Sequence, residues 1–262
     1  MKALVVGASR GIGAAIALRL AKDGIARSGF AQIVITARAP SPALTEVASG
    51  ITRLGAQPHI VTGDIGDATV PARIGAEAIE ACGGLDLVVA NAGITSPGPL
   101  ATLSIESWER LFAVNTRGPW LLAQSVYEAL RATKGSFVAV ASMSGMFPHP
   151  GSGSYSSTKA ALIMMCQQLA QEWGPDGVRV NAVCPGMIRT PMTESIYADP
   201  AIAARRDEIV PLKRVGQPDD IARVVSFLGS DDARYVTGEA IRADGGFSSS
   251  ILSYVPGLAK SR

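Results

Sequence analysis

The sequence predicts an α/β fold, a doubly wound parallel sheet in a single domain with helices on both faces. Short apolar segments alternate with helical patterns along almost the whole chain. The apolar segments are nearly unbroken, which is typical of strands that are buried on both faces. A glycine-rich turn joins the first of them, residues 3–6, to the first helical pattern.

Each element is predicted from its local pattern, taken in chain order. Apolar runs rich in Val and Ile predict strands at residues 3–6, 33–37, 58–62, 85–90, 136–141 and 178–183. Periodic stretches rich in Ala and Leu predict helices at residues 14–22, 43–54, 70–81, 105–130 and 155–173. Gly118-Pro119 should interrupt the fourth helix, and residues 24–31 should form a slightly long loop. No linker or repeat divides the chain, so we expect one domain over residues 1–247 and a tail over residues 248–262.

Composition excludes several classes of function. The chain has 262 residues, 47% hydrophobic and 18% charged, which suits a large core and not a disordered chain. The net charge is +2 and the basic residues are scattered, so we expect no nucleic-acid partner. We also expect no membrane span and no cleavable leader. Three isolated cysteines and two histidines favour a reduced cytoplasmic protein without a metal site.

The turn after the first strand reads Gly7-Ala8-Ser9-Arg10-Gly11-Ile12-Gly13. Glycines let the backbone approach a pyrophosphate closely, and the start of the next helix offers free N–H groups. Strand, glycine turn and helix in this order predict a dinucleotide site of the Rossmann type, although the spacing differs from the familiar GxGxxG. The alternative is a strand-to-helix turn that binds nothing.

Two arginines favour NADP over NAD as the dinucleotide. The second strand ends at Arg38, where NAD-binding sites place an acidic residue on the adenosine ribose. Arg10 lies inside the glycine turn, and two guanidiniums can together hold a 2′-phosphate. The alternative for either arginine is simple solvation.

Several candidate site residues follow directly after predicted strands. In parallel sheets the ligands bind beyond the carboxyl ends of the strands. The sequence therefore predicts that one crevice is ringed by Gly7, Arg38, Asp64, Asn91, Ser142 and Pro185-Gly186.

A tyrosine and a lysine lie one turn apart on the last long predicted helix. Tyr155 and Lys159 are separated by four residues, so their side chains should share one face. A nearby ammonium group favours phenolate, so we expect Lys159 to lower the pKa of Tyr155 and make it a general acid or base. The alternative is an amphipathic helix with a chance pair.

The chain resembles the short-chain dehydrogenase/reductase family, of the compact single-domain kind, from residue 3 to about residue 247. The resemblance is carried by motifs in family order and spacing: Gly7 to Gly13, Asn91-Ala92-Gly93, Asn115, Ser142, Tyr155 with Lys159, Val178-Arg179-Val180-Asn181, Pro185-Gly186, Thr190-Pro191, residues 211–218, Val236-Thr237-Gly238 and Asp244-Gly245-Gly246.

The resemblance implies a reaction and its catalytic residues. The family interconverts ketones or aldehydes and alcohols, as carbonyl reductases or alcohol dehydrogenases, by hydride transfer with the nicotinamide. Tyr155 would exchange a proton with the substrate oxygen, and Ser142 would position the carbonyl. Lys159 would also contact the nicotinamide ribose, and Asn115 would hold a water in a proton relay. The alternatives are a strand cap for Ser142 and a helix-break residue for Asn115.

The resemblance also implies the cofactor contacts. Those to the pyrophosphate are Gly7, Gly11, Ile12 and Gly13, and those to the 2′-phosphate are Ser9, Arg10 and Arg38. The adenine would meet Asp64 and Ile65. The ribose and nicotinamide end would meet Asn91, Ala92, Gly93, Tyr155, Lys159, Pro185, Gly186, Ile188 and Thr190.

Two positions depart from the family pattern. Val6 stands where the family usually has Thr, and Ala90 where it usually has Asn. Both lie on inner strands, so we expect the loss of a structural hydrogen bond and no change in the chemistry.

The resemblance also indicates which segments would contact the substrate. Residues 143–152 resemble one wall of the substrate pocket, in which His149 either touches substrate or is a solvated loop residue. Residues 191–210 resemble a mobile lid. Cys184 is expected to be a small buried residue, not a reactive thiol.

The resemblance suggests a homotetramer formed by the Tyr155 and Asn115 helices, with the tail able to reach a neighbour's lid. Two other functions remain open: a non-catalytic NADP(H)-binding regulator and a sugar-nucleotide epimerase or dehydratase relative. The presence of both Tyr155 and Lys159 argues against the first. The chain length and the glycine spacing argue against the second.

Overall fold

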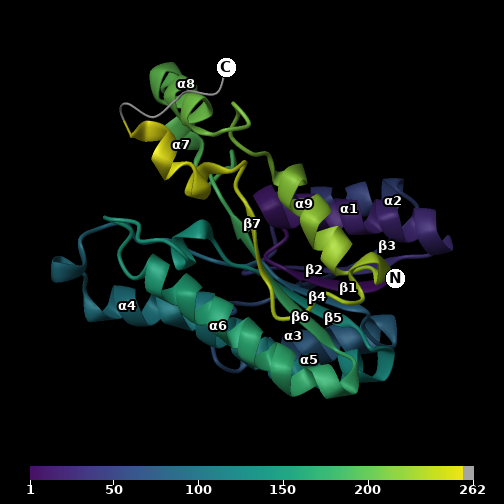
Figure 1. Cartoon of the computed structure of the whole chain (residues 1–262). Coiled ribbons are helices and arrows are strands. Elements are labelled where there is room, and N and C mark those ends of the chain that lie inside the picture. The colour runs from purple at the N-terminus through teal and green to yellow at the C-terminus, as the bar shows by residue number, and fades with distance from the viewer. Residues whose placement is uncertain (256–262) are drawn as a thin grey trace.

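The centre of the molecule is a seven-stranded, wholly parallel sheet, which confirms the predicted fold class (Figure 1). In the computed structural model, which describes residues 1–255, the strand order is β3-β2-β1-β4-β5-β6-β7. The order reverses between β1 and β4, the kind of switch point at which such sheets bind ligands. The strands are β1 (Lys2–Val6), β2 (Gln32–Ala37), β3 (Gln57–Thr62), β4 (Leu87–Ala90), β5 (Ser136–Val140), β6 (Arg179–Pro185) and β7 (Ala240–Ala243).

Helices cover both faces of the sheet (Figure 1). One face carries α1 (Gly11–Ser28), α2 (Pro42–Arg53) and α9 (Pro218–Leu228), and the other carries α3 (Val70–Cys82), α4 (Ile105–Phe112), α5 (Gly118–Thr133) and α6 (Tyr155–Trp173). Along β1, Leu4 and Val6 belong to one buried core, whereas Ala3 and Val5 belong to the other. Because each strand contributes to two cores, it reads as an unbroken apolar run.

The first helix is longer than the sequence predicts. The expected loop over residues 24–31 is wrong, because α1 continues to Ser28 and ends at Gly29 with φ +66°. Gly24 is buried in the helix, where a Cβ atom would lie 2.9 Å from the Cβ of Ala31 and 3.1 Å from that of Met1. The glycine therefore serves close packing and not a turn, a purpose that its local sequence does not reveal.

The predicted interruption of the long helix takes the form of a π-helix. Residues Ala113–Arg117 form it between α4 and α5, and Gly118 is the first residue of α5. A Cβ atom on Gly118 would overlap the carbonyl oxygen of Ile65, so only glycine fits there. Pro119 lacks the N–H that would donate to the carbonyl of Asn115 in a regular α-helix. The break therefore leaves the Asn115 carbonyl without its usual helical donor.

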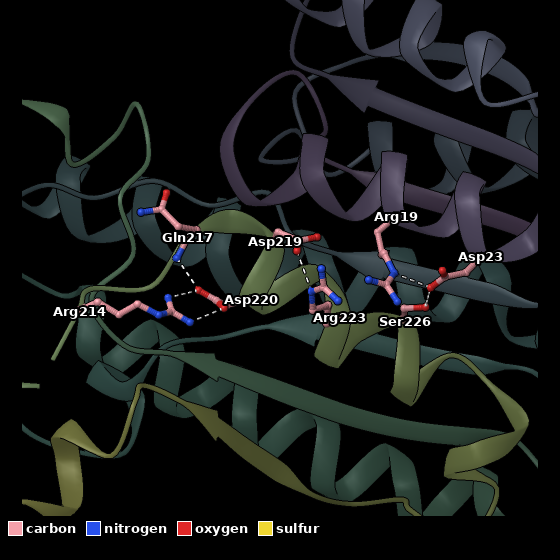
Figure 2. A network of polar contacts seen from close by, with 8 residues as sticks. All are labelled: Arg19, Asp23, Arg214, Gln217, Asp219, Asp220, Arg223 and Ser226. Atoms are coloured by element: carbon pink, nitrogen blue, oxygen red, sulfur yellow. Dashed lines mark hydrogen bonds and ion pairs between the residues drawn. The ribbon is translucent and has the colours of Figure 1, made fainter. Parts of the chain in front are cut away.

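A polar network joins α1 to α9 (Figure 2). The Ser226 hydroxyl donates to Asp23 Oδ2 at 2.5 Å, and Arg19 Nε donates to the same oxygen at 2.7 Å. Ser226 is buried and the Asp23 side chain is mostly shielded. By contrast, the Asp219–Arg223 pair of α9 is exposed.

Asp23→Ala is expected to lower the free energy of unfolding by about 1–3 kcal/mol, because it leaves the buried Ser226 hydroxyl without a partner. Urea denaturation measures this change. Asp219→Ala is the matched control on the same helix pair and should cost less than about 1 kcal/mol, since its ion pair is exposed. Equal losses in the two variants would contradict the expectation.

The segment predicted as a lid follows β6 and contains α7 (Glu194–Tyr197) and α8 (Pro200–Ile209). Its two ends meet where Gly216 N donates to the carbonyl of Met187 at 2.9 Å. Beyond it, Arg214 binds both carboxylate oxygens of Asp220, at 2.7 and 2.8 Å (Figure 2). Hydrogen bonding by the Arg214 guanidinium lowers the pKa of Asp220 to about 2. The lid therefore rises from a base that is fixed to the start of α9.

The described part of the tail returns to the lid of its own chain. Short 3₁₀ turns cover Phe247–Ser249 and Ile251–Tyr254, and the Tyr254 hydroxyl donates to the carbonyl of Ile209 at 2.5 Å. Contact with a neighbour's lid stays a prediction, and residues 256–262 lie outside the described part. Within residues 1–255, no helix combines the length and apolarity needed to cross a membrane.

Candidate active site

The glycine turn is packed tightly against the end of β4. Gly7 has φ +84°, and a Cβ atom there would lie 2.7 Å from the Cα of Ala92. A Cβ atom on Gly13 would overlap the Gly7 carbonyl oxygen. Asn91 Nδ2 donates to that same oxygen at 2.7 Å. Only glycines allow the turn to fold this closely.

The two departures from the family pattern have local consequences only. Val6 and Ala90 are both buried in the apolar core. The Gly7 N–H donates to the carbonyl of Thr36 at 3.1 Å and also lies 3.3 Å from its hydroxyl oxygen. Thr36 on β2 therefore brings a hydroxyl to the turn, a contact that sequence reasoning missed because the residue is 29 positions away.

The residues present fit a dinucleotide phosphate. Helix α1 begins at Gly11 with no acidic residue in its first turn, and the preceding Arg10 makes no side-chain cap. The first N–H groups of the helix and its positive dipole end are therefore open to an anion. Arg10 and Arg38 are both exposed, and no carboxylate lies within 4.0 Å of either guanidinium in residues 1–255. Ser9 and Ile12 lie in the same turn, half-buried.

The predicted adenine contacts lie after β3, near Arg38. Asp64 accepts hydrogen bonds from the Arg110 guanidinium at 2.6 Å and from the Gly66 N–H at 2.9 Å. Burial raises the pKa of Asp64, but these bonds and the charges of Arg110 and Arg38 outweigh it and hold the pKa below its usual range. Ile65 is buried. Adenine binding by the pair stays a prediction.

The predicted catalytic residues gather where β5 ends and α6 begins. Ser142 follows β5, and Tyr155 is the first residue of α6. Lys159 Nζ lies 5.7 Å from the centroid of the Tyr155 ring and donates to the Val140 carbonyl at 2.8 Å. A Cβ atom on Gly93 would lie 3.4 Å from Lys159 Nζ, so the segment after β4 packs close to the lysine ammonium.

The predicted pKa of Tyr155 is wrong for this structure. Desolvation of its hydroxyl raises the pKa of Tyr155, and a hydrogen bond from Ser142 lowers it in part. Lys159 Nζ donates its hydrogen bond to the Val140 carbonyl. Burial in turn lowers the pKa of Lys159 to about 8. The phenol is therefore protonated at neutral pH in the absence of bound cofactor.

Asn115 is fully buried in the π-helix and holds two parts of the site together. Its Oδ1 accepts from the Ile94 N–H at 2.9 Å, and its Nδ2 donates to the Ile94 carbonyl at 3.0 Å. Nδ2 also donates to Thr158 Oγ1, beside Lys159, at 3.1 Å. The side chain is thus occupied, and the group left for a water is its main-chain carbonyl.

The remaining predicted cofactor residues lie at the end of β6 and directly after it. Gly186 packs against Asp244, whose Cβ would lie 2.5 Å from a Cβ on the glycine. The Thr190 side chain lies 3.6 Å from where Gly11 would carry a Cβ atom. Ile188 is buried, and Pro185 ends β6. The start of the lid therefore lies directly over the glycine turn.

His149 is exposed but held by a specific contact. Its Nδ1 lies 3.0 Å from the hydroxyl oxygen of buried Ser144, whose N–H donates to Ser142 Oγ at 3.1 Å. Ser144 is a residue that sequence reasoning missed, although its position two after Ser142 was a usable signal. Cys184 is confirmed as buried, and burial raises the pKa of its thiol to about 11.

Comparisons with known proteins agree with this geometry. A family model described as "Enoyl-(Acyl carrier protein) reductase" matches residues 7–248. Glucose 1-dehydrogenase of Gluconobacter oxydans is 36% identical, over 94% of this chain and 91% of the relative. The 3-oxoacyl-[acyl-carrier-protein] reductase of Synechocystis is 34% identical, over 93% of this chain and 95% of the relative.

Solved structures show the same fold. A short-chain type dehydrogenase/reductase from Mycobacterium marinum has a TM-score of 0.85 at 32% identity and covers 94% of both chains. A candidate 2-deoxy-D-gluconate 3-dehydrogenase from Agrobacterium tumefaciens, solved with bound NADP, has a TM-score of 0.84 at 31% identity. That alignment covers 94% of this chain and 96% of the other.

Proposed function

This chain belongs to the short-chain dehydrogenase/reductase family, and we propose that it is an NADP(H)-dependent oxidoreductase that interconverts a ketone or aldehyde and an alcohol, as a carbonyl reductase. The observation that carries the proposal is the gathering of Asn115, Ser142, Tyr155 and Lys159 beside the glycine turn. Each of these groups suits one task at a carbonyl carbon.

Each side chain has its own proposed role in the reaction. The nicotinamide, when bound, supplies or accepts the hydride. Tyr155 keeps its proton at neutral pH, so it can donate it to a carbonyl oxygen in the reductive direction. The Ser142 hydroxyl, which lowers the pKa of Tyr155 in part, would orient that oxygen. Lys159 and the main-chain carbonyl of Asn115 would return a proton to Tyr155 through a water.

The reaction is tested with NADPH and a panel of ketones and aldehydes, by following the loss of NADPH absorbance. Turnover of at least one compound is expected. Tight NADPH binding without any turnover would contradict catalysis and favour a regulator that senses the cofactor.

The cofactor preference rests on Arg10 and Arg38. Arg38→Ala is expected to raise the Kd for NADPH by about 10-fold and to leave that for NADH nearly unchanged, because charge-assisted hydrogen bonds to a 2′-phosphate are lost. Arg27→Ala is the matched control, since it removes the same charge from the far end of α1. Equal affinity of the unaltered protein for NADH and NADPH would contradict the preference.

We also propose a cytoplasmic homotetramer. Large apolar side chains are exposed on the helices expected at the interface, among them Trp120 on α5 and Met164 on α6. Exposed apolar surface of this kind favours association. All three cysteines are buried and unpaired, which suits a reducing compartment. Sedimentation equilibrium tests the assembly.

A further inference from the structure

We propose that the lid carries a binding site for an anionic group of the substrate, a carboxylate or a phosphate ester, formed by Arg189 and Arg206 around Tyr197. The inference rests on the proposed function and names the class of its substrate: a hydroxy or oxo compound with a negative charge away from the reacting carbon.

Tyr197 places two guanidiniums close together. The Arg189 Cζ lies 4.9 Å from the Tyr197 ring centroid, and the Arg206 Cζ lies 5.3 Å from it. The two guanidinium carbons are therefore within about 10 Å of one another. Arg206 Nη1 also donates to the Tyr197 hydroxyl at 3.4 Å. Stacking on the ring fixes both cations without neutralising them.

Of the four carboxylates of the lid, Asp199, Asp207 and Glu208 are engaged elsewhere, and Glu194 makes no hydrogen bond or ion pair among the described residues. Glu208 pairs with Arg205 at 2.6 Å, Asp207 accepts from the Val215 N–H at 2.7 Å, and Asp199 caps α8. No carboxylate lies within 4.0 Å of Arg189 or Arg206 in the described part of the chain. Two like charges at this separation repel each other, and a bound anion would relieve the repulsion.

Arg189 lies at the base of the lid, between two residues that are expected to contact the cofactor. Arg189 stands between Ile188 and Thr190, and its N–H donates to the Gly216 carbonyl at 2.9 Å, which fixes its backbone at the lid base. The Thr190 side chain lies over Gly11. The arginines expected at the cofactor's 2′-phosphate are a separate pair, Arg10 and Arg38. A guanidinium fork suits a carboxylate or phosphate, so Arg189 and Arg206 fit a charged end of the substrate.

The test compares two ketones that differ only in charge, 4-oxopentanoate and 4-oxopentanamide, at low ionic strength. We expect the acid to have the higher kcat/KM in the unaltered protein. Arg189→Gln and Arg206→Gln should each lower the acid-to-amide ratio of kcat/KM by about 10-fold, mainly through KM. An unchanged ratio in both variants would overturn the proposal.

Arg205→Gln is the matched control. It removes the same charge from the neighbouring position on α8, but its guanidinium is exposed and paired with Glu208. The ratio should stay unchanged in this variant. The same fall in all three variants would show a general effect of lid charge and would also overturn the proposal.

A binding measurement separates this proposal from the proposed function. If no ketone is reduced, malonate, succinate and inorganic phosphate are titrated calorimetrically into the protein with NADP⁺ present. Binding that weakens about 10-fold in Arg206→Gln and not in Arg205→Gln supports the anion site even though the proposed reaction has failed. Absence of binding by all three anions overturns the anion site.

Discussion

Replacing Tyr155 with Phe is expected to lower kcat/KM for carbonyl reduction by roughly 10²–10⁴-fold, because the substitution removes only the hydroxyl that donates the proton. The ring and the helix start would stay in place, since Tyr155 begins α6 and its neighbours Ser154 and Thr158 are buried. The measurement is steady-state kinetics with the best carbonyl compound of the panel.

The control for this variant is cofactor binding. NADPH should bind to Tyr155→Phe with a Kd close to that of the unaltered protein, because the proposed phosphate contacts lie in the glycine turn and at Arg38. Retained turnover in the variant would show that another group delivers the proton.

Lys159→Met is expected to lower activity by roughly 10²–10⁴-fold while making the cofactor-free protein more stable. The Lys159 ammonium is buried, and its only contact among the hydrogen bonds of residues 1–255 is with the Val140 carbonyl. Methionine fills a similar volume without the cost of burying a charge. Chemical denaturation at neutral pH should show a gain of about 1–3 kcal/mol, since the lowered pKa corresponds to an upper value of about 3 kcal/mol.

The sign of the pH dependence follows from the pKa of Lys159, about 8 in the folded protein against an ordinary 10.5. Below pH 8 both folded and unfolded chains carry the proton, and the burial cost is fully present. Between pH 8 and 10.5 the unfolded chain binds more protons, so the stability of the unaltered protein rises with pH relative to Lys159→Met. Parallel stability curves for the two proteins over this range would contradict the assignment.

Most of the fold could be predicted from local patterns. The first six strands were predicted within a few residues because a strand that lies between two helical layers is apolar on both faces, whereas β7 and the helices α7 to α9 were not predicted. The helix α6 was predicted from Tyr155 to Trp173, where it is found, because hydroxyl residues precede a run of strong helix formers. The boundary of α1 was wrong because Gly24 packs against residues 1 and 31, which local sequence does not connect.

Some residues of the candidate site could likewise be predicted from the sequence, and others could not. Gly7, Ser142, Tyr155 and Lys159 could be proposed from sequence, since the strand-end rule and the helical spacing place them without knowledge of packing. The contact of Thr36 with the glycine turn and the pairing of Ser144 with His149 join groups from separate segments. Such contacts depend on how the chain returns on itself.

The sequence by itself determined the doubly wound sheet and the candidate residues at the ends of its strands, because these depend on periodicity and on the order of elements. Only the tertiary structure decided the electrostatics. Desolvation raises the pKa of Tyr155 where the four-residue spacing predicted a lowering, and it is the burial of Lys159 that lowers the lysine's own pKa. The pairing of Arg189 and Arg206 on Tyr197 likewise depends on how α7 and α8 fold over the end of β6. Charge energies depend on burial and distance, and both are fixed only when the layers pack.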